Sequence, residues 1–142
     1  MRKSIVIIAT VLILAIVLSV SCSQSRLDDP GDWSFYTRID NYFLFVTLNF
    51  HGAGNMVMKV SLDSADSSGS FEVTKKGTYS PSSDSTGKLS VDFSTEERLK
   101  DYFSVFSGTY SCSGYTLEVT TDNTVIPELR NMTFRIYGTI PD

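Results

Sequence analysis

Cysteine is the most reactive side chain in this 142-residue sequence, and it occurs only twice, as Cys22 and Cys112. Cys22 follows an apolar run that ends in small residues, where an export signal would be cleaved. If Cys22 is consumed by modification, Cys112 has no partner, and we expect no disulfide within the domain. A Cys22–Cys112 bridge stays open only if Cys22 keeps its thiol. Cys112 shares the strand parity of Tyr110, which predicts a buried, small apolar side chain.

Histidine occurs once, as His51, beside glycines in a predicted turn. A lone histidine without a cysteine pair does not make the usual zinc site, and no nucleophile stands at a recognisable spacing from it. Neither a phosphate-binding glycine loop nor a Gly-x-Ser-x-Gly elbow occurs. The sequence therefore predicts no enzyme and no cofactor, and we expect His51 to be an exposed turn residue.

Two runs of serine and aspartate invite a calcium interpretation, one around Asp63 and Asp66 and the other around Asp84. Neither run has the alternating aspartate spacing of a dedicated calcium loop. We therefore expect solvated loops and no metal site.

The chain begins with Arg2 and Lys3 and then carries no charge from residue 4 to residue 24. Its apolar part, residues 5 to 18, gives way to small residues, which is the pattern of a secretory signal. This run is shorter than the roughly 20 residues that a membrane-spanning helix needs. We expect residues 1–21 to be a signal peptide.

The segment from Leu18 to Cys22, Leu-Ser-Val-Ser-Cys, resembles the lipobox of bacterial lipoproteins. The resemblance implies that Cys22 receives a diacylglyceryl thioether, with palmitate-type chains, and becomes the new N-terminus. Ser19 stands where leucine is usual, so cleavage without lipidation is the alternative. Ser23 replaces the aspartate that retains lipoproteins in the inner membrane, which implies the outer membrane, on its periplasmic or surface face.

Removal of residues 1–21 leaves ten basic and sixteen acidic residues, a charge of about −6. Nucleic acids and anionic lipids are bound by basic patches, so no nucleic-acid partner is expected. The remaining length suits one domain, and the many aromatic and β-branched residues favour strands.

Alternating polar and apolar residues predict antiparallel strands, each with one buried face. The strongest pair is residues 42–50 and 56–62, joined by glycine-rich turn residues. The sequence also contains a short internal repeat. Gly-Thr-Tyr-Ser begins at Gly77 and again at Gly108, and each copy precedes a turn, a glycine and a strand. The predicted inward residues are Tyr42, Leu44, Val46, Leu48, Phe50, Met56, Met58, Val60, Leu62, Phe71, Val73, Leu89, Val91, Phe93, Leu117, Val119, Met132, Phe134 and Ile136.

One segment departs from this alternation. Leu99, Tyr102, Phe103 and Phe106 recur with helical spacing after a possible cap at Ser94. The spacing predicts one short helix over residues 95–106, whose apolar stripe covers one end of the sheet; a functional lid is the alternative.

The sequence thus predicts an all-β fold, an antiparallel meander of about seven or eight strands that closes as a small barrel or sandwich with one short helix. This pattern resembles the lipocalin-like, calycin-type domains of small bacterial lipoproteins. Gly31-Asp32-Trp33 matches the lipocalin Gly-x-Trp signature only in these three residues. The expected organisation is a signal (1–21), a lipidated tether (22–32) and a lipocalin-like β domain (33–142).

Two functions follow from this organisation. The first is a membrane-anchored, non-catalytic binding or scaffolding domain of the cell envelope, which contacts another envelope protein or a host factor. The second is a lipocalin-like carrier of a small apolar ligand. A core filled by side chains favours the first, whereas an open apolar cavity of about 300 Å³ or more favours the second.

Overall fold

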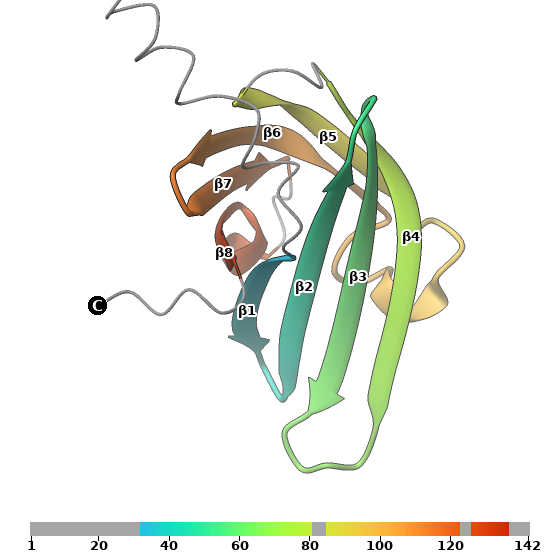
Figure 1. Ribbon diagram of the computed structural model, residues 1–142. Helices are drawn as coiled ribbons and strands as arrows, with labels where there is room; N and C mark the ends of the chain where they lie inside the picture. The colour runs from blue at the N-terminus through green and yellow to red at the C-terminus, as the bar shows by residue number, and fades with distance from the viewer. Residues whose placement is uncertain (1–31, 81–84, 123–125, 137–142) are drawn as a thin grey trace, which may run out of the picture.

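The computed structural model describes residues 32–80, 85–122 and 126–136, which form eight antiparallel strands (Figure 1). Each strand pairs with the next and β8 pairs with β1, so the sheet closes into a barrel. The predicted all-β class is confirmed, and a barrel replaces the sandwich alternative. The strands are β1 (Trp33–Ile39), β2 (Tyr42–His51), β3 (Asn55–Ser64), β4 (Ser70–Ser80), β5 (Thr86–Asp92), β6 (Val105–Ser113), β7 (Thr116–Thr121) and β8 (Asn131–Ile136).

The barrel closes through a short seam between β1 and β8. Among the described residues, only Trp33 and Ser34 pair across it, whereas all seven residues of β1 pair with β2. Beyond the paired residues the rings of Phe35 and Phe134 stay in contact, with centroids 5.5 Å apart. Trp33 has no exposed surface, so the residue of the isolated Gly-x-Trp match fills the core where the barrel closes.

Period-two alternation fills the barrel interior with apolar side chains. Successive strand residues point to opposite faces, and the alternation places one face of every strand inside. Phe71, Val73 and Ile136 are half-buried against this core and Tyr42 is exposed at its edge. The almost fully buried residues of the strands include Trp33, Leu44, Val46, Leu48, Met56, Met58, Val60, Leu89, Val91, Leu117, Val119, Met132 and Phe134.

The predicted helix over residues 95–106 is wrong. The segment contains one 3-10 turn, η1 (Glu97–Leu99), and from Val105 the chain is already strand β6. Phe106 pairs with Val91 of β5, because β6 supplies the backbone hydrogen-bond partners of both β5 and β7 in the closed barrel. The core role predicted for the apolar stripe holds for Leu99, Phe103 and Phe106, which are buried, whereas Tyr102 is half-buried against the core.

The repeated Gly-Thr-Tyr-Ser motif has a structural explanation. Gly77 on β4 and Gly108 on β6 face inward where the next strand passes very close. A Cβ at Gly77 would lie 2.5 Å from the Ser90 carbonyl oxygen, and one at Gly108 would overlap the backbone of Thr120. The glycines therefore allow β4 and β6 to bend tightly over their neighbours, as the curved ribbons of Figure 1 show.

Candidate functional site

The barrel interior is occupied by the protein's own side chains. At the end of the barrel near the β2–β3 turn, the tyrosines of both motif copies, Tyr79 and Tyr110, pack with Phe50. The Phe50 ring centroid lies 4.9 Å from that of Tyr79 and 6.1 Å from that of Tyr110. These three buried rings close that end of the core. The hollows described below are all open to solvent.

The segment between β5 and β6 packs against the other end of the barrel. The Phe103 ring lies between those of Phe93 and Phe106, at centroid distances of 5.3 and 5.5 Å. Lys75 of β4 holds this segment from the inner side of the sheet, with its Nζ 2.6 Å from a carboxylate oxygen of Glu96 and 3.2 Å from the Thr95 hydroxyl. Ring packing and the contacts of Lys75 therefore hold the segment against the barrel. These contacts argue against the alternative that the segment is a functional lid.

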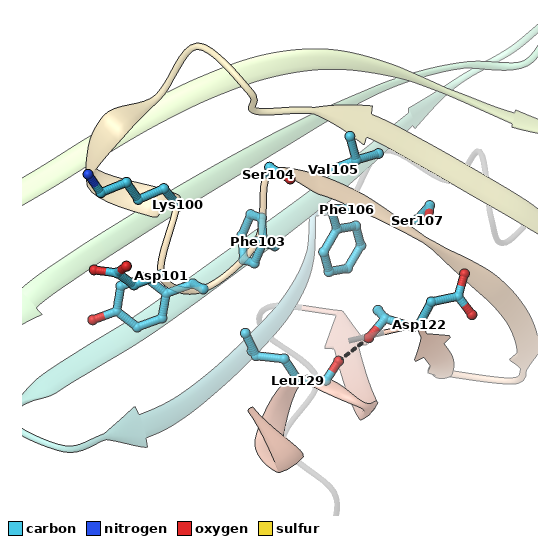
Figure 2. Close-up of a pocket in the computed structure, with 11 residues that line it drawn as sticks. Lys100, Asp101, Phe103, Ser104, Val105, Phe106, Ser107, Asp122 and Leu129 are labelled. Carbon is cyan, nitrogen blue, oxygen red and sulfur yellow. Dashed lines mark hydrogen bonds between the residues drawn. The ribbon is translucent and has the colours of Figure 1, made fainter. Parts of the chain in front are cut away.

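A hollow of about 300 Å³ lies between this segment and the β7–β8 connection (Figure 2). Phe103 and Phe106 lie on its apolar side near Leu129, and Lys100, Asp101 and Asp122 carry charge around it. The Thr121 hydroxyl donates a hydrogen bond to the Leu129 carbonyl, which fixes its floor. Phe103, Phe106 and Leu129 are buried in the core and expose little surface. A ligand in the hollow would therefore mainly contact the charged residues around it.

A larger cleft of about 460 Å³ opens at the same end, where β2, β3 and β4 extend past the packed segment. Tyr42, Phe71 and Tyr102 give it aromatic walls, and Leu62 contributes an apolar side chain. The Arg98 guanidinium lies 5.1 Å from the Phe71 ring centroid, within cation–π range. Burial raises the pKa of Tyr102 above its usual value, with the nearby Tyr42 and aspartates adding to the shift. The phenol is therefore even less inclined than an ordinary tyrosine to ionise, so this wall of the cleft stays uncharged.

A second aromatic group lies on the outer wall of the barrel and was not predicted. Tyr36 of β1 pairs with Phe45 of β2, and their ring centroids are 4.7 Å apart. Phe43 stacks on the other side of Tyr36 at 5.8 Å, and the Arg38 guanidinium lies 5.6 Å from the Phe43 ring. We call Tyr36, Arg38, Phe43 and Phe45 the outer aromatic patch. Tyr36 and Phe45 are exposed and Phe43 is half-buried, so the patch presents aromatic rings on the outside of the barrel.

The structure describes Cys112 and His51, the two other residues singled out for their chemistry. Cys22 lies outside the described residues. Cys112 pairs with Leu117 and packs half-buried against the core, so its inward parity is confirmed but its burial is less complete than predicted. His51 is exposed at the end of β2, as expected, and its carbonyl oxygen accepts a 3.4 Å hydrogen bond from the Tyr79 hydroxyl.

The aspartates around the β3–β4 turn organise that turn. Asp66 accepts hydrogen bonds from the Ser64 hydroxyl and, at 2.9 Å, from the Ser68 backbone N–H. Among the described residues, no group of three or more His, Cys, Asp or Glu side chains is placed to hold a metal ion. Asp84 lies outside the part of the chain that the structure describes.

Asp66 is expected to titrate well below an ordinary aspartate. Hydrogen bonds from the Ser64 hydroxyl and then from Ser68 lower its pKa from 3.8 to about 2. Because the folded pKa is depressed, the carboxylate supports the turn fully above pH 4 or so and loses that effect as the pH falls toward 2. An NMR titration should give a midpoint near 2 for Asp66, and Ser64→Ala should raise it. A wild-type midpoint near 3.8 would contradict the hydrogen-bonded turn.

Comparison of the chain with models of known protein families, with curated proteins and with solved structures finds no match. Within the part of the chain that the structure describes, no helical segment has the length and hydropathy needed to span a bilayer.

Proposed function

We propose that this protein is a lipid-anchored, non-catalytic binding domain of the bacterial cell envelope. The observation that carries the proposal is the filled barrel. Its interior is packed with aliphatic and aromatic side chains, so binding falls to the surface, where the cleft beside Tyr42 and Arg98 offers aromatic, charged and hydroxyl groups together. A cleft that combines rings with a guanidinium suits a polypeptide partner.

The membrane anchor rests on the N-terminal sequence. Arg2 and Lys3, the uncharged apolar run and the small residues before Cys22 have the order of an export signal. Two or three acyl chains on Cys22 would hold the domain stably, because a single chain gives only marginal binding. Ser23 after the cysteine supports the outer membrane. The mature domain would then begin about ten residues from its lipid.

Replacing Cys22 with alanine should move the protein from the detergent phase to the aqueous phase after phase separation. The reason is the loss of about 0.8 kcal/mol for every methylene that no longer enters the membrane. Metabolic labelling with palmitate should mark the wild-type protein and leave the Cys22→Ala variant unmarked. Ser23→Ala is the matched control and should keep both label and detergent partitioning. Unchanged partitioning of Cys22→Ala would overturn the anchor.

The binding role can be tested at the cleft. Tyr42 is 42% exposed, so Tyr42→Ser removes a cleft wall with little loss of core packing. Tyr115 is 56% exposed at the β6–β7 turn, which makes Tyr115→Ser the matched control. Crosslinking in intact cells followed by mass spectrometry should recover one envelope protein with wild type and the control, and lose it with Tyr42→Ser. Recovery of the same partner with all three proteins would place the binding surface elsewhere.

A small-ligand carrier is the second candidate, favoured by the size and lining of the same cleft. Its volume of about 460 Å³ falls within the usual range for small-molecule pockets, and Leu62 and Phe71 supply apolar walls. Mass spectrometry of the protein purified from native membranes distinguishes the two. A stoichiometric small apolar molecule that is lost from Tyr42→Ser would favour the carrier.

A further inference from the structure

The outer aromatic patch is the largest cluster of exposed rings that we find in the described residues. Tyr36 is 53% exposed and Phe45 43% exposed, although both are in regular strands and neither fills the core. A hollow of about 550 Å³ beside them is lined by Ser34, Phe35, Tyr36 and Phe45, among others. Clustered exposed apolar groups of this kind mark contact surfaces more often than isolated ones do.

The position of the patch in the chain indicates what covers it. Tyr36 is three residues from Trp33, the first residue of β1, where the chain from Cys22 enters the barrel. Ten residues, 22 to 31, reach at most about 36 Å in any conformation. A lipid on Cys22 would therefore keep this wall close to the bilayer, and the tether would make contact between them an intramolecular event.

The chemistry of the patch fits the headgroup region of a bilayer. Tyrosine rings are enriched at this depth, where one end is apolar and the other wet. Arg38 packs its guanidinium near Phe43 and can keep its charge in water while its stem lies against lipid. The wall is close to balanced in charge, in contrast to the acidic chain as a whole. Its outward charges on β1 to β4 are Arg38, Lys59, Lys76, Asp63 and Glu72, and Asp32 lines the hollow beside the patch.

We propose that the outer wall of β1 and β2, through Tyr36, Arg38, Phe43 and Phe45, lies on the phospholipid surface to which the protein is anchored. This inference rests on the proposed anchor at Cys22. The opposite wall, around β5 and β6, would then face away from the membrane. The anchored domain would have a defined orientation, with the headgroup region as the partner of its aromatic patch.

Fluorescence quenching by lipid tests this orientation on the full lipidated protein in phosphatidylcholine vesicles. One environment-sensitive probe is placed at Ser61→Cys, whose residue pairs with Phe45 on the outer face. The other is at Ser90→Cys, on the exposed face of β5. Both carry Cys112→Ser so that the probe has a single site. Lipids brominated near the headgroup should quench the probe at 61 and leave the probe at 90 at its lipid-free level.

Substitution of the rings gives the second arm. The double variant Tyr36→Ser, Phe45→Ser should lose the quenching at 61 while remaining bound to the vesicles, and Tyr115→Ser should keep it. Circular dichroism checks that each variant is folded. If the protein floats with vesicles but both probes are quenched equally, the orientation is wrong and the anchor stands. If the protein does not float at all, the anchor fails and the orientation fails with it. A patch-dependent dimer in detergent would also overturn the inference, because a second copy would be the occupant.

Discussion

Replacing Gly108 with alanine is expected to lower the melting temperature by about 10 °C or more, since excess volume at a tightly packed position costs up to about 3 kcal/mol. The added Cβ would overlap the carbonyl group of Thr120 on β7. That obstacle is backbone held in the β6–β7 ladder, so it cannot rotate away as the tip of a side chain would. The two strands would have to move apart at this point of the ladder.

Gly52 provides the matched control for this substitution. It lies in the β2–β3 turn, and an added Cβ there meets nothing within 4 Å. Gly52→Ala should therefore leave the melting temperature nearly unchanged, while Gly77→Ala should resemble Gly108→Ala because its Cβ meets Ser90 and Val91. Equal melting temperatures for the variants at 52 and 108 would contradict the close approach of β6 and β7.

Phe103→Ala should be comparably destabilising. Phe103 is 8% exposed and its ring packs edge to face between two others. Truncation of a buried phenylalanine costs about 3 to 5 kcal/mol, a large share of the roughly 5 to 15 kcal/mol that stabilises a domain. Thermal or urea unfolding should show a clear loss. The expectation does not depend on a helix, because the ring is buried against Phe93 and Phe106 in the loop that the structure shows.

Val105→Ala is the control for the same segment, since Val105 is 50% exposed at the start of β6. It should change the melting temperature by no more than a degree or two. A similarly small change for Phe103→Ala, together with altered ligand retention, would restore the idea of a mobile lid over a ligand site. A large change supports a segment that belongs to the core.

Alternation was enough to predict most of the strands, because each strand of a closed barrel has one dry and one wet face. It predicted the inward faces of β2 and β3 from Leu44 to Leu62. β1 was not singled out as a strand, although Trp33, Phe35, Thr37 and Ile39 alternate and Asp40 then turns the chain with a positive φ of 52°. The turn at residues 40 and 41, between this alternating run and the next, was the signal that could have identified β1 as the first strand of a hairpin.

The helix was mispredicted because its spacing arose from two different structures. Leu99 and Phe103 come from a 3-10 turn and the loop after it, and Phe106 comes from a strand. Their sequence separations match one helical face by coincidence, while the pairing of β6 with β5 and β7 is determined by distant residues. Local periodicity carries no information on such long-range pairing.

The outer aromatic patch could not be predicted from one strand at a time. Phe43 and Phe45 occupy the outward positions of β2, which normally hold polar residues, and this was the only local sign. Tyr36 reaches them through the cross-strand register of β1 and β2. Only the pairing of the two strands brings Tyr36 of β1 against both Phe43 and Phe45 of β2.

The seam between β1 and β8 determines how the barrel responds to mechanical load. Within residues 32–80, 85–122 and 126–136, the two residue pairs that close it involve Trp33 and Ser34, which are near the start of the described chain. Tension applied from that side reaches this seam, which has the fewest pairs among the described strands, as well as the first of the seven pairs that join β1 to β2. Antiparallel pairs loaded at one end separate one after another, so a pulled domain would open along this seam while β2 to β7 keep their ladder.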